Sequence, residues 1–140
     1  KEVIAKAIDL ATNMTYGVPG FIQQAGIFAL EQGKEFEEKI SYPFNRRRKL
    51  ALNILKDFPN LDHIPPQGAM YIMLNIRTTG MSGISFAHKL LDTEKIAVMP
   101  GESFGEAASG HVRISLTLAD RKFEETFRRI CKFASSLSDG

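Results

Sequence analysis

The strongest candidate for chemistry in this sequence is an arginine in an alternating segment near the C-terminal end. Residues 111–116 read His-Val-Arg-Ile-Ser-Leu, so Arg113 falls on the polar face of an expected strand whose other face is apolar. A planar guanidinium can bind a carboxylate through two parallel hydrogen bonds, which a lysine ammonium cannot do. The pattern therefore indicates either an anion-binding site at Arg113 or an ordinary half-buried strand whose polar face lies in water.

The segment before this strand, residues 100–110, is rich in glycine and serine. It lacks the glycine spacing and the Lys-Ser/Thr ending of a phosphate-binding P-loop. Glycines of this kind commonly serve turn geometry, so a simple connection is one interpretation. The alternative interpretation is that the segment forms the rim of a ligand site, because it joins two expected strands.

Other reactive residue types lack the neighbours that catalysis or metal binding requires. His63, His88 and His111 have no cysteine or carboxylate at metal-ligand spacing, so we predict no metal site. The single cysteine, Cys131, excludes an internal disulfide and falls on the apolar side of an expected helix. No nucleophile elbow or nucleophile–base pair is visible, so we expect no catalytic residue in this chain.

Length and charge restrict the class of protein. The chain has 140 residues, enough for one ordinary domain, and its 18 Lys and Arg against 16 Asp and Glu leave a net charge of +2, which argues against nucleic-acid binding. We expect the basic run 46–49 to be a solvated helix face, because successive helical residues point around the axis. No apolar run approaches the roughly 20 residues that cross a bilayer, so we expect no membrane partner. The lone cysteine fits a reducing, cytoplasmic location.

Hydrophobic periodicity indicates which elements position these residues. Helical spacing dominates the first half, and strand-length apolar runs alternate with helices in the second half. Pro43 should kink or split the third helix. The fold class predicted is α/β (α+β-like), a short, mostly antiparallel sheet of about three strands covered by helices. The expected helices are 1–14, 21–32, 34–58, a short helix opening at 82 and 120–137, and the expected strands are 69–76, 96–99 and 111–116.

Taken in order, several segments resemble the C-terminal part of a class I/II, fold-type I aminotransferase dependent on pyridoxal 5'-phosphate (PLP). They are residues 46–50, 66–71, 96–105 and 111–116, and the Pro-Gly-Glu-Ser-Phe-Gly loop followed by Val-Arg-Ile-Ser is the most specific part. The resemblance covers essentially the whole chain. It implies that residues 1–19 are a connecting helix and loop from a large domain outside this chain, and that residues 20–140 form the small domain.

The resemblance also implies roles for single residues. Arg113 would bind the α-carboxylate of the substrate, with Tyr71 and Phe104 beside it. Thr15 and Tyr16 match the stretch that approaches the cofactor site of a neighbouring subunit, in a family whose members are usually homodimers. Leu74 departs from the pattern, because many relatives have proline there.

The family's cofactor-binding lysine lies in a Ser-Lys motif followed by a Gly-x-Arg segment, and neither motif is present in this sequence. We therefore interpret the chain as part of a longer enzyme that transfers an amino group from an amino acid to a 2-oxo acid, and we expect the isolated chain to be inactive. Two alternatives stay open. One is the aminotransferase-like ligand-binding domain of a transcription regulator, and the other is a PLP-dependent lyase or synthase of the same fold.

Overall fold

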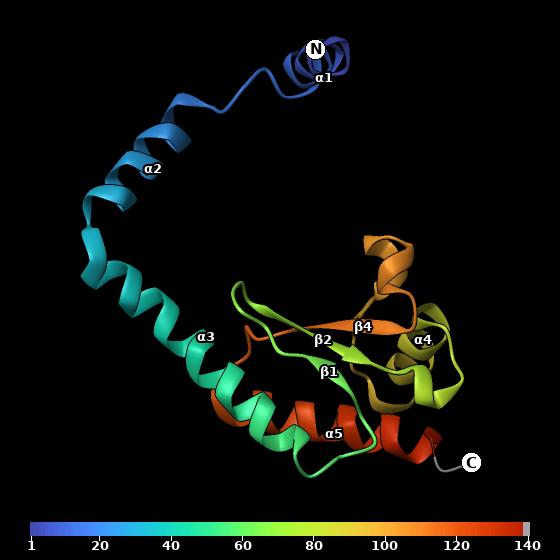
Figure 1. The fold of residues 1–140 in the computed structure, drawn as a ribbon. Helices are drawn as coiled ribbons and strands as arrows, with labels where there is room; N and C mark the ends of the chain where they lie inside the picture. The colour runs from blue at the N-terminus through green and yellow to red at the C-terminus, as the bar shows by residue number, and fades with distance from the viewer. Residues whose placement is uncertain (139–140) are drawn as a thin grey trace. The chain divides into compact units, whose positions relative to one another are not determined.

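The structure is a computed structural model that describes residues 1–138. The chain divides into two compact units, Lys1–Ile40 and Ser41–Gly140, which are described separately. Helix α3 (Gly33–Leu55) runs across the division between them (Figure 1). The predicted domain boundary after residue 19 stays a prediction.

The first unit consists of α1 (Glu2–Thr15), α2 (Gly20–Glu31) and the beginning of α3. Both of its first helices agree with the predicted ranges to within one residue. Residue Tyr16, with φ of 51°, ends α1 in the left-handed conformation, and Gly17 with φ of 81° follows it. Every residue from 1 to 40 is exposed, so the amphipathic spacing that predicts these helices has no buried counterpart within this unit.

Helix α3 is a single element with Pro43 inside it, so of the two outcomes expected at the proline, a kink or a split, the split does not occur. Proline removes one backbone donor and crowds the preceding turn, which weakens a helix locally without forcing it to end. Beyond Pro43, α3 buries Ala51, Ile54 and Leu55. This tertiary packing stabilises the second half of the helix against the local cost of the proline.

The second unit is built on an antiparallel sheet of four strands in the order β1-β2-β4-β3. Its strands are β1 (His63–Ile64), β2 (Tyr71–Asn75), β3 (Met99–Pro100) and β4 (His111–Ser115). The predicted fold class is confirmed. The two-residue β1 was not predicted because it is too short to show alternation. Of the strand expected at 96–99, only Met99 is paired.

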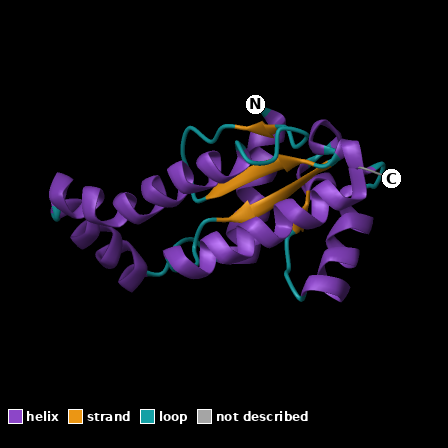
Figure 2. Ribbon diagram, turned by 90° about the horizontal axis from the view of Figure 1, so that it is seen from below, coloured by secondary structure: helices purple, strands orange, loops and turns teal. Residues whose placement is uncertain are grey.

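The helices pack on one face of this sheet (Figures 1 and 2). Side chains of β2 and β4 alternate, so Ile72, Leu74, Val112 and Ile114 are buried while their neighbours in β2 are only half-buried. The buried strand residues share one core with α3, with α4 (Gly83–Glu94) and with α5 (Asp120–Ser138). The residues that alternate with these buried strand residues lie on the opposite face of the sheet. The helical core residues of α4 and α5 include Phe86, Leu90, Phe123, Phe127, Ile130, Cys131 and Ala134.

An arginine of α3 fastens the end of β4 to the start of α5. Arg47 donates from Nε to Asp120 Oδ1 at 2.8 Å and from Nη1 to the Leu116 carbonyl at 2.9 Å. Arg46 forms an ion pair with the same Asp120 carboxylate. The expectation that residues 46–49 form a solvated face is therefore wrong for Arg47, whose side chain is only 13% exposed.

Within residues 1–138, no helix combines the length and apolarity that a membrane span would need. The same residues contain no grouping of three or more His, Cys, Asp or Glu side chains suited to a metal ion.

Candidate functional site: an uncommitted arginine beside two aromatic rings

The strand pairing places Tyr71 and Arg113 diagonally across from each other. In the β2–β4 ladder Tyr71 lies opposite Ser115 and Met73 lies opposite Arg113. Diagonal neighbours on one sheet face are within reach of long and aromatic side chains. The Arg113 Cζ atom accordingly lies 4.1 Å from the centroid of the Tyr71 ring.

A second ring reaches Arg113 from the loop that follows β3. The chain leaves β3 into the short 3₁₀ helix η2 (Gly101–Phe104), and Phe104 ends it. The Phe104 ring centroid lies 4.4 Å from Arg113 Cζ, although the residue is 47% exposed. The structure thus brings together Arg113, Tyr71 and Phe104, which come from three different elements. Their functional roles remain predictions.

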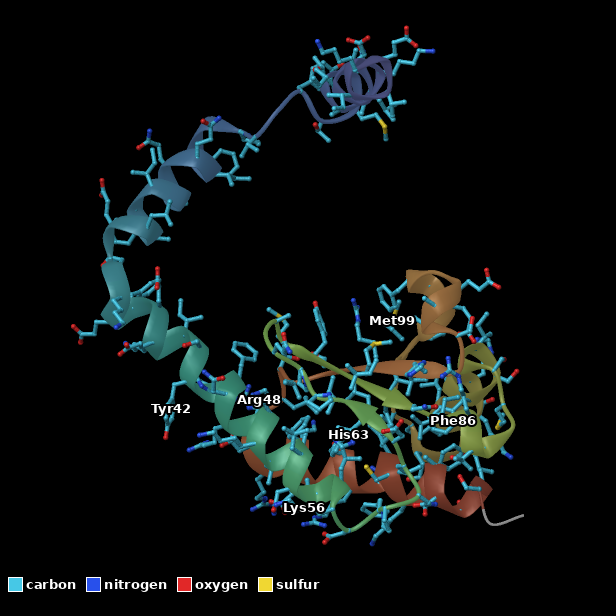
Figure 3. All side chains as sticks on the ribbon, viewed as in Figure 1. Tyr42, Arg48, Lys56, His63, Phe86 and Met99 are labelled. Carbon is cyan, nitrogen blue, oxygen red and sulfur yellow. The ribbon has the colours of Figure 1, made fainter. Side chains whose placement is uncertain are left out.

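Arg113 and Tyr71 line a small cavity of about 160 Å³, and Phe104 is not among its lining residues. Arg113 and Ser115 line it from β4, and Tyr71 lines it from β2. The β3 side of the cavity was not predicted. Met99, which is labelled in Figure 3, pairs directly with Arg113 in the β3–β4 ladder. The remaining lining residues are Ala97 and Val98. Alternation along the strand could have predicted that Ser115, two residues from Arg113, lines the same cavity. It could not predict which residues of another strand do so.

The hydrogen-bonding groups of Arg113 are uncommitted within residues 1–138, where the guanidinium forms no ion pair. Contacts with aromatic faces hold a guanidinium in place without using its in-plane N–H donors. The same N–H groups can then grip a carboxylate in a bidentate fork. Arg113 thus presents in-plane donors that are chemically able to bind a planar anion.

A larger cavity of about 390 Å³ adjoins the first, since Ala97 and Ser115 line both. It extends from the residues before β3 to the first half of α5. Two of its three cations are already engaged. Arg129 donates to Glu94 Oε2 at 2.8 Å, and Lys95 Nζ donates to the Asp92 carbonyl at 2.9 Å. We therefore assign the candidate site to the smaller cavity, where the arginine has no such partner.

The two residues predicted to approach a partner's cofactor lie in the first unit. Thr15 is the last residue of α1, and its Oγ1 donates to the Ala11 carbonyl at 2.7 Å. Tyr16 is 89% exposed. The hydroxyl of Thr15 is thus engaged within its own helix, and the predicted role of both residues stays a prediction.

His111 differs from the expectation that it shares the open polar face with Arg113. It is only 6% exposed, and its Nδ1 lies 3.2 Å from the Ser109 carbonyl. The backbones of Gly83 and Gly101 pack against the His111 carbonyl, so neighbouring segments cover the first residue of β4. The polar face of β4 therefore begins at Arg113.

Comparisons with known proteins identify the family. The sequence model of the family "Aminotransferase class I and II" matches residues 1–130. The chain belongs to the class I and II aminotransferase family. An arginine–pyruvate transaminase of Pseudomonas aeruginosa is 41% identical over 129 residues, which are 92% of this chain and 33% of that protein. The chain thus spans about a third of the length of the curated relatives it matches.

Solved structures agree with this assignment. An aromatic aminotransferase from Pyrococcus horikoshii superposes with a TM-score of 0.72 at 36% identity, covering 83% of this chain and 31% of that one. An aspartate aminotransferase from Thermus thermophilus, solved with maleate, superposes with a TM-score of 0.71 at 29% identity over 97% of this chain and 34% of that one. In both superpositions this chain matches about a third of a longer chain.

Proposed function

We propose that this chain is the substrate-carboxylate part of a PLP-dependent aminotransferase, in which Arg113 binds the α-carboxylate of an amino acid or 2-oxo acid. The observation that carries the proposal is the state of Arg113, a guanidinium held against Tyr71 and Phe104 with no competing acid within residues 1–138. The relatives named above are aminotransferases. A related structure was solved with maleate, which is a dicarboxylate.

The proposed task of Arg113 is orientation. A bidentate fork fixes the plane of the bound carboxylate, and this limits the directions in which the adjoining α-carbon can point. Holding the reacting bond in a fixed direction contributes to catalysis by lowering the entropic cost of reaching the transition state. The apolar side of the cavity, from Ala97 to Met99, limits the water that can compete for the guanidinium.

PLP is the cofactor that the family implies for the whole protein, and its chemistry is to withdraw electrons from the α-carbon of the bound amino acid. The residues described here fit the substrate and do not fit the cofactor. The six residues that line the cavity include no lysine, and their one charged group, Arg113, faces aromatic rings. Thr15 already uses its hydroxyl within α1. We therefore propose that the cofactor is held by parts of the protein outside this chain, and that the isolated chain does not transaminate.

The partners proposed are amino-acid and 2-oxo-acid substrates and a second copy of the full-length protein in a homodimer. Neither nucleic acid nor a membrane is proposed as a partner. The location proposed is cytoplasmic, as the single buried Cys131 thiol fits a reducing compartment.

The experiment replaces Arg113 in the full-length protein with lysine. Lysine keeps the positive charge but cannot form the planar fork, so the variant should lose one charge-assisted hydrogen bond. Such a bond contributes roughly 1.5–3 kcal/mol, so we expect kcat/KM for amino acids to fall about 10- to 150-fold. Cofactor binding, followed by its visible absorbance, should be unchanged.

Arg121→Lys is the matched control, because Arg121 is exposed on α5 and has no ion pair within residues 1–138. It should leave the kinetic constants unaltered. An Arg113→Lys enzyme that keeps the wild-type kcat/KM would show that the substrate carboxylate is bound elsewhere. Release of ammonia or thiol from the amino acid without any need for an amino-group acceptor would instead assign the protein to a lyase.

A further inference from the structure

Near the start of the loop that carries Phe104, the side chain of Glu102 is hydrogen-bonded to the first residue of α4. Glu102 Oε1 accepts a hydrogen bond of 2.8 Å from the backbone N–H of Gly83, the first residue of α4. The first N–H groups of a helix have no partner within the helix, and they attract negative charge. The second oxygen, Oε2, is buried and has no hydrogen-bond partner within residues 1–138. The Glu102 side chain thus connects η2 to α4, and its Oε2 atom is shielded from solvent.

The backbone around Glu102 leaves little room for movement. A Cβ atom on Gly83 would clash with Glu102 Oε2 and would lie 2.7 Å from the His111 carbonyl oxygen. A Cβ atom on Gly101 would clash with the Ala108 carbonyl and would also lie 2.7 Å from the His111 oxygen. The two glycines therefore let the start of α4, η2 and the start of β4 meet at backbone distance.

The far end of the same loop is fixed independently. Arg77 Nη2 donates to the Ser109 carbonyl at 2.9 Å, and the Ile76 N–H donates to the Gly110 carbonyl at 2.9 Å. Between these two ends, residues 103–107 are all exposed. Phe104 lies in this exposed middle, and its nearest side-chain anchor along the chain is Glu102, two residues before it.

We propose that Glu102 is a positioning residue, which holds η2 against α4 so that Phe104 stays on the guanidinium of Arg113. The proposal rests on the proposed function of Arg113 as the carboxylate-binding group. Neither Glu102 nor Phe104 lines the cavity, and Glu102 acts through Phe104, whose ring centroid lies 4.4 Å from Arg113 Cζ. The substrate never touches Glu102.

Electrostatics supports the ionised form of Glu102 at neutral pH. Its pKa is held below its usual value, chiefly by its own backbone N–H and next by that of Gly83, with partial burial opposing and the Gly110 N–H adding a smaller effect. A glutamine at this position can still accept from Gly83, but it has no charge to interact with the helix terminus. Glu102→Gln therefore tests the anchor while keeping the shape of the side chain.

The experiment measures kcat and KM for an amino acid in the full-length protein and in three variants, Glu102→Gln, Phe104→Ala and the double variant. We expect Glu102→Gln to raise KM about 3- to 10-fold and to change kcat by less than about twofold, because a loosened ring weakens the hold on Arg113 without altering the reacting groups. In the double variant KM should equal that of Phe104→Ala to within about twofold, since two residues that act in series are non-additive. Glu106→Gln, an exposed acid in the same loop, is the matched control and should keep wild-type KM.

Hydrogen exchange of residues 101–110, measured by mass spectrometry, is the readout that does not depend on turnover. Exchange should be faster in Glu102→Gln than in the wild type and in Glu106→Gln. An unchanged KM and unchanged exchange in Glu102→Gln would overturn the positioning role, and so would fully additive effects in the double variant. If Arg113→Lys raises KM while Glu102→Gln does not, this proposal fails and the proposed function stands. A wild-type protein without aminotransferase activity would overturn both.

Discussion

The two neighbouring arginines of α3 share one carboxylate, and we expect them to differ strongly in what they contribute to stability. Arg46 and Arg47 both contact Asp120, but their side chains are 59% and 13% exposed respectively. Arg47 alone also donates to the Leu116 carbonyl, directly after β4. The perturbation is replacement of each arginine by methionine, which retains most of the apolar stem and removes the guanidinium.

The magnitudes follow from exposure. Exposed ion pairs contribute about 0–1 kcal/mol, so Arg46→Met should lower the free energy of unfolding by less than about 1 kcal/mol. Arg47 makes two hydrogen bonds at a site shielded from water. Hydrogen bonds to charged groups contribute about 1.5–3 kcal/mol each after exchange with water, so the two together give an upper bound of about 3–6 kcal/mol, which the 25% exposure of the Asp120 side chain reduces. Arg47→Met should therefore cost about 2–4 kcal/mol. For a folded unit of this size such a loss lowers Tm by about 10–20 °C.

The assay is thermal and urea unfolding of the 140-residue chain, followed by far-UV circular dichroism because the chain contains no tryptophan. Adding 1 M NaCl should remove most of the small Arg46 contribution and leave the Arg47 contribution largely intact, because salt screens exposed pairs more than shielded ones. Equal losses for the two variants, or a loss below about 1 kcal/mol for Arg47→Met, would refute the reasoning from burial.

Two further predictions concern the chain as a whole and its thiol. The purified 140-residue chain, supplied with PLP, an amino acid and a 2-oxo acid, should form no product, and any turnover would show that the catalytic groups are present in it. The Cys131 thiol should resist iodoacetamide at pH 8 in the folded chain and react in urea, because burial raises its pKa to about 12. Since the folded state keeps this proton while the unfolded state loses it, the free energy of unfolding should fall as pH rises from about 9 towards 12, and Cys131→Ala should remove that part of the fall. A folded-state thiol that reacts as fast as in urea would contradict the buried position of Cys131.

The elements of the second unit could be predicted where their sequence period is long enough to read. Helix α5 and strand β4 bury one stripe or one face each, and both were predicted within one or two residues. Strand β1 could not be found, because two residues carry no period and the segment owes its pairing to β2. Whether Pro43 would kink or split α3 could not be decided from the sequence for a similar reason. The local effect of the proline at residue 43 can be predicted from the sequence. The packing of Ile54 and Leu55 in the core, which stabilises the helix beyond the proline, cannot.

The candidate site was predictable in its residues and not in its surroundings. Arg113 stands out by alternation alone, whereas Tyr71 and Phe104 entered through the family resemblance. The contacts between them depend on the β2–β4 register and on the path of η2, which no single segment of sequence determines. Glu102 was missed because its hydrogen-bond partner is a backbone N–H 19 residues away.

What distinguishes Arg113 from the other arginines is its tertiary environment and not its type. Arg47, Arg77 and Arg129 are equally able to fork onto a carboxylate, but each already donates to a carbonyl or carboxylate of this chain. An arginine that is engaged in this way contributes to the stability of the fold and has fewer donors free for a ligand. Arg113 instead receives its support from aromatic rings, which hold the cation while leaving its donors unpaired within residues 1–138. Because these unpaired donors lie beside a cavity, Arg113 is the arginine that we propose as the substrate-binding group.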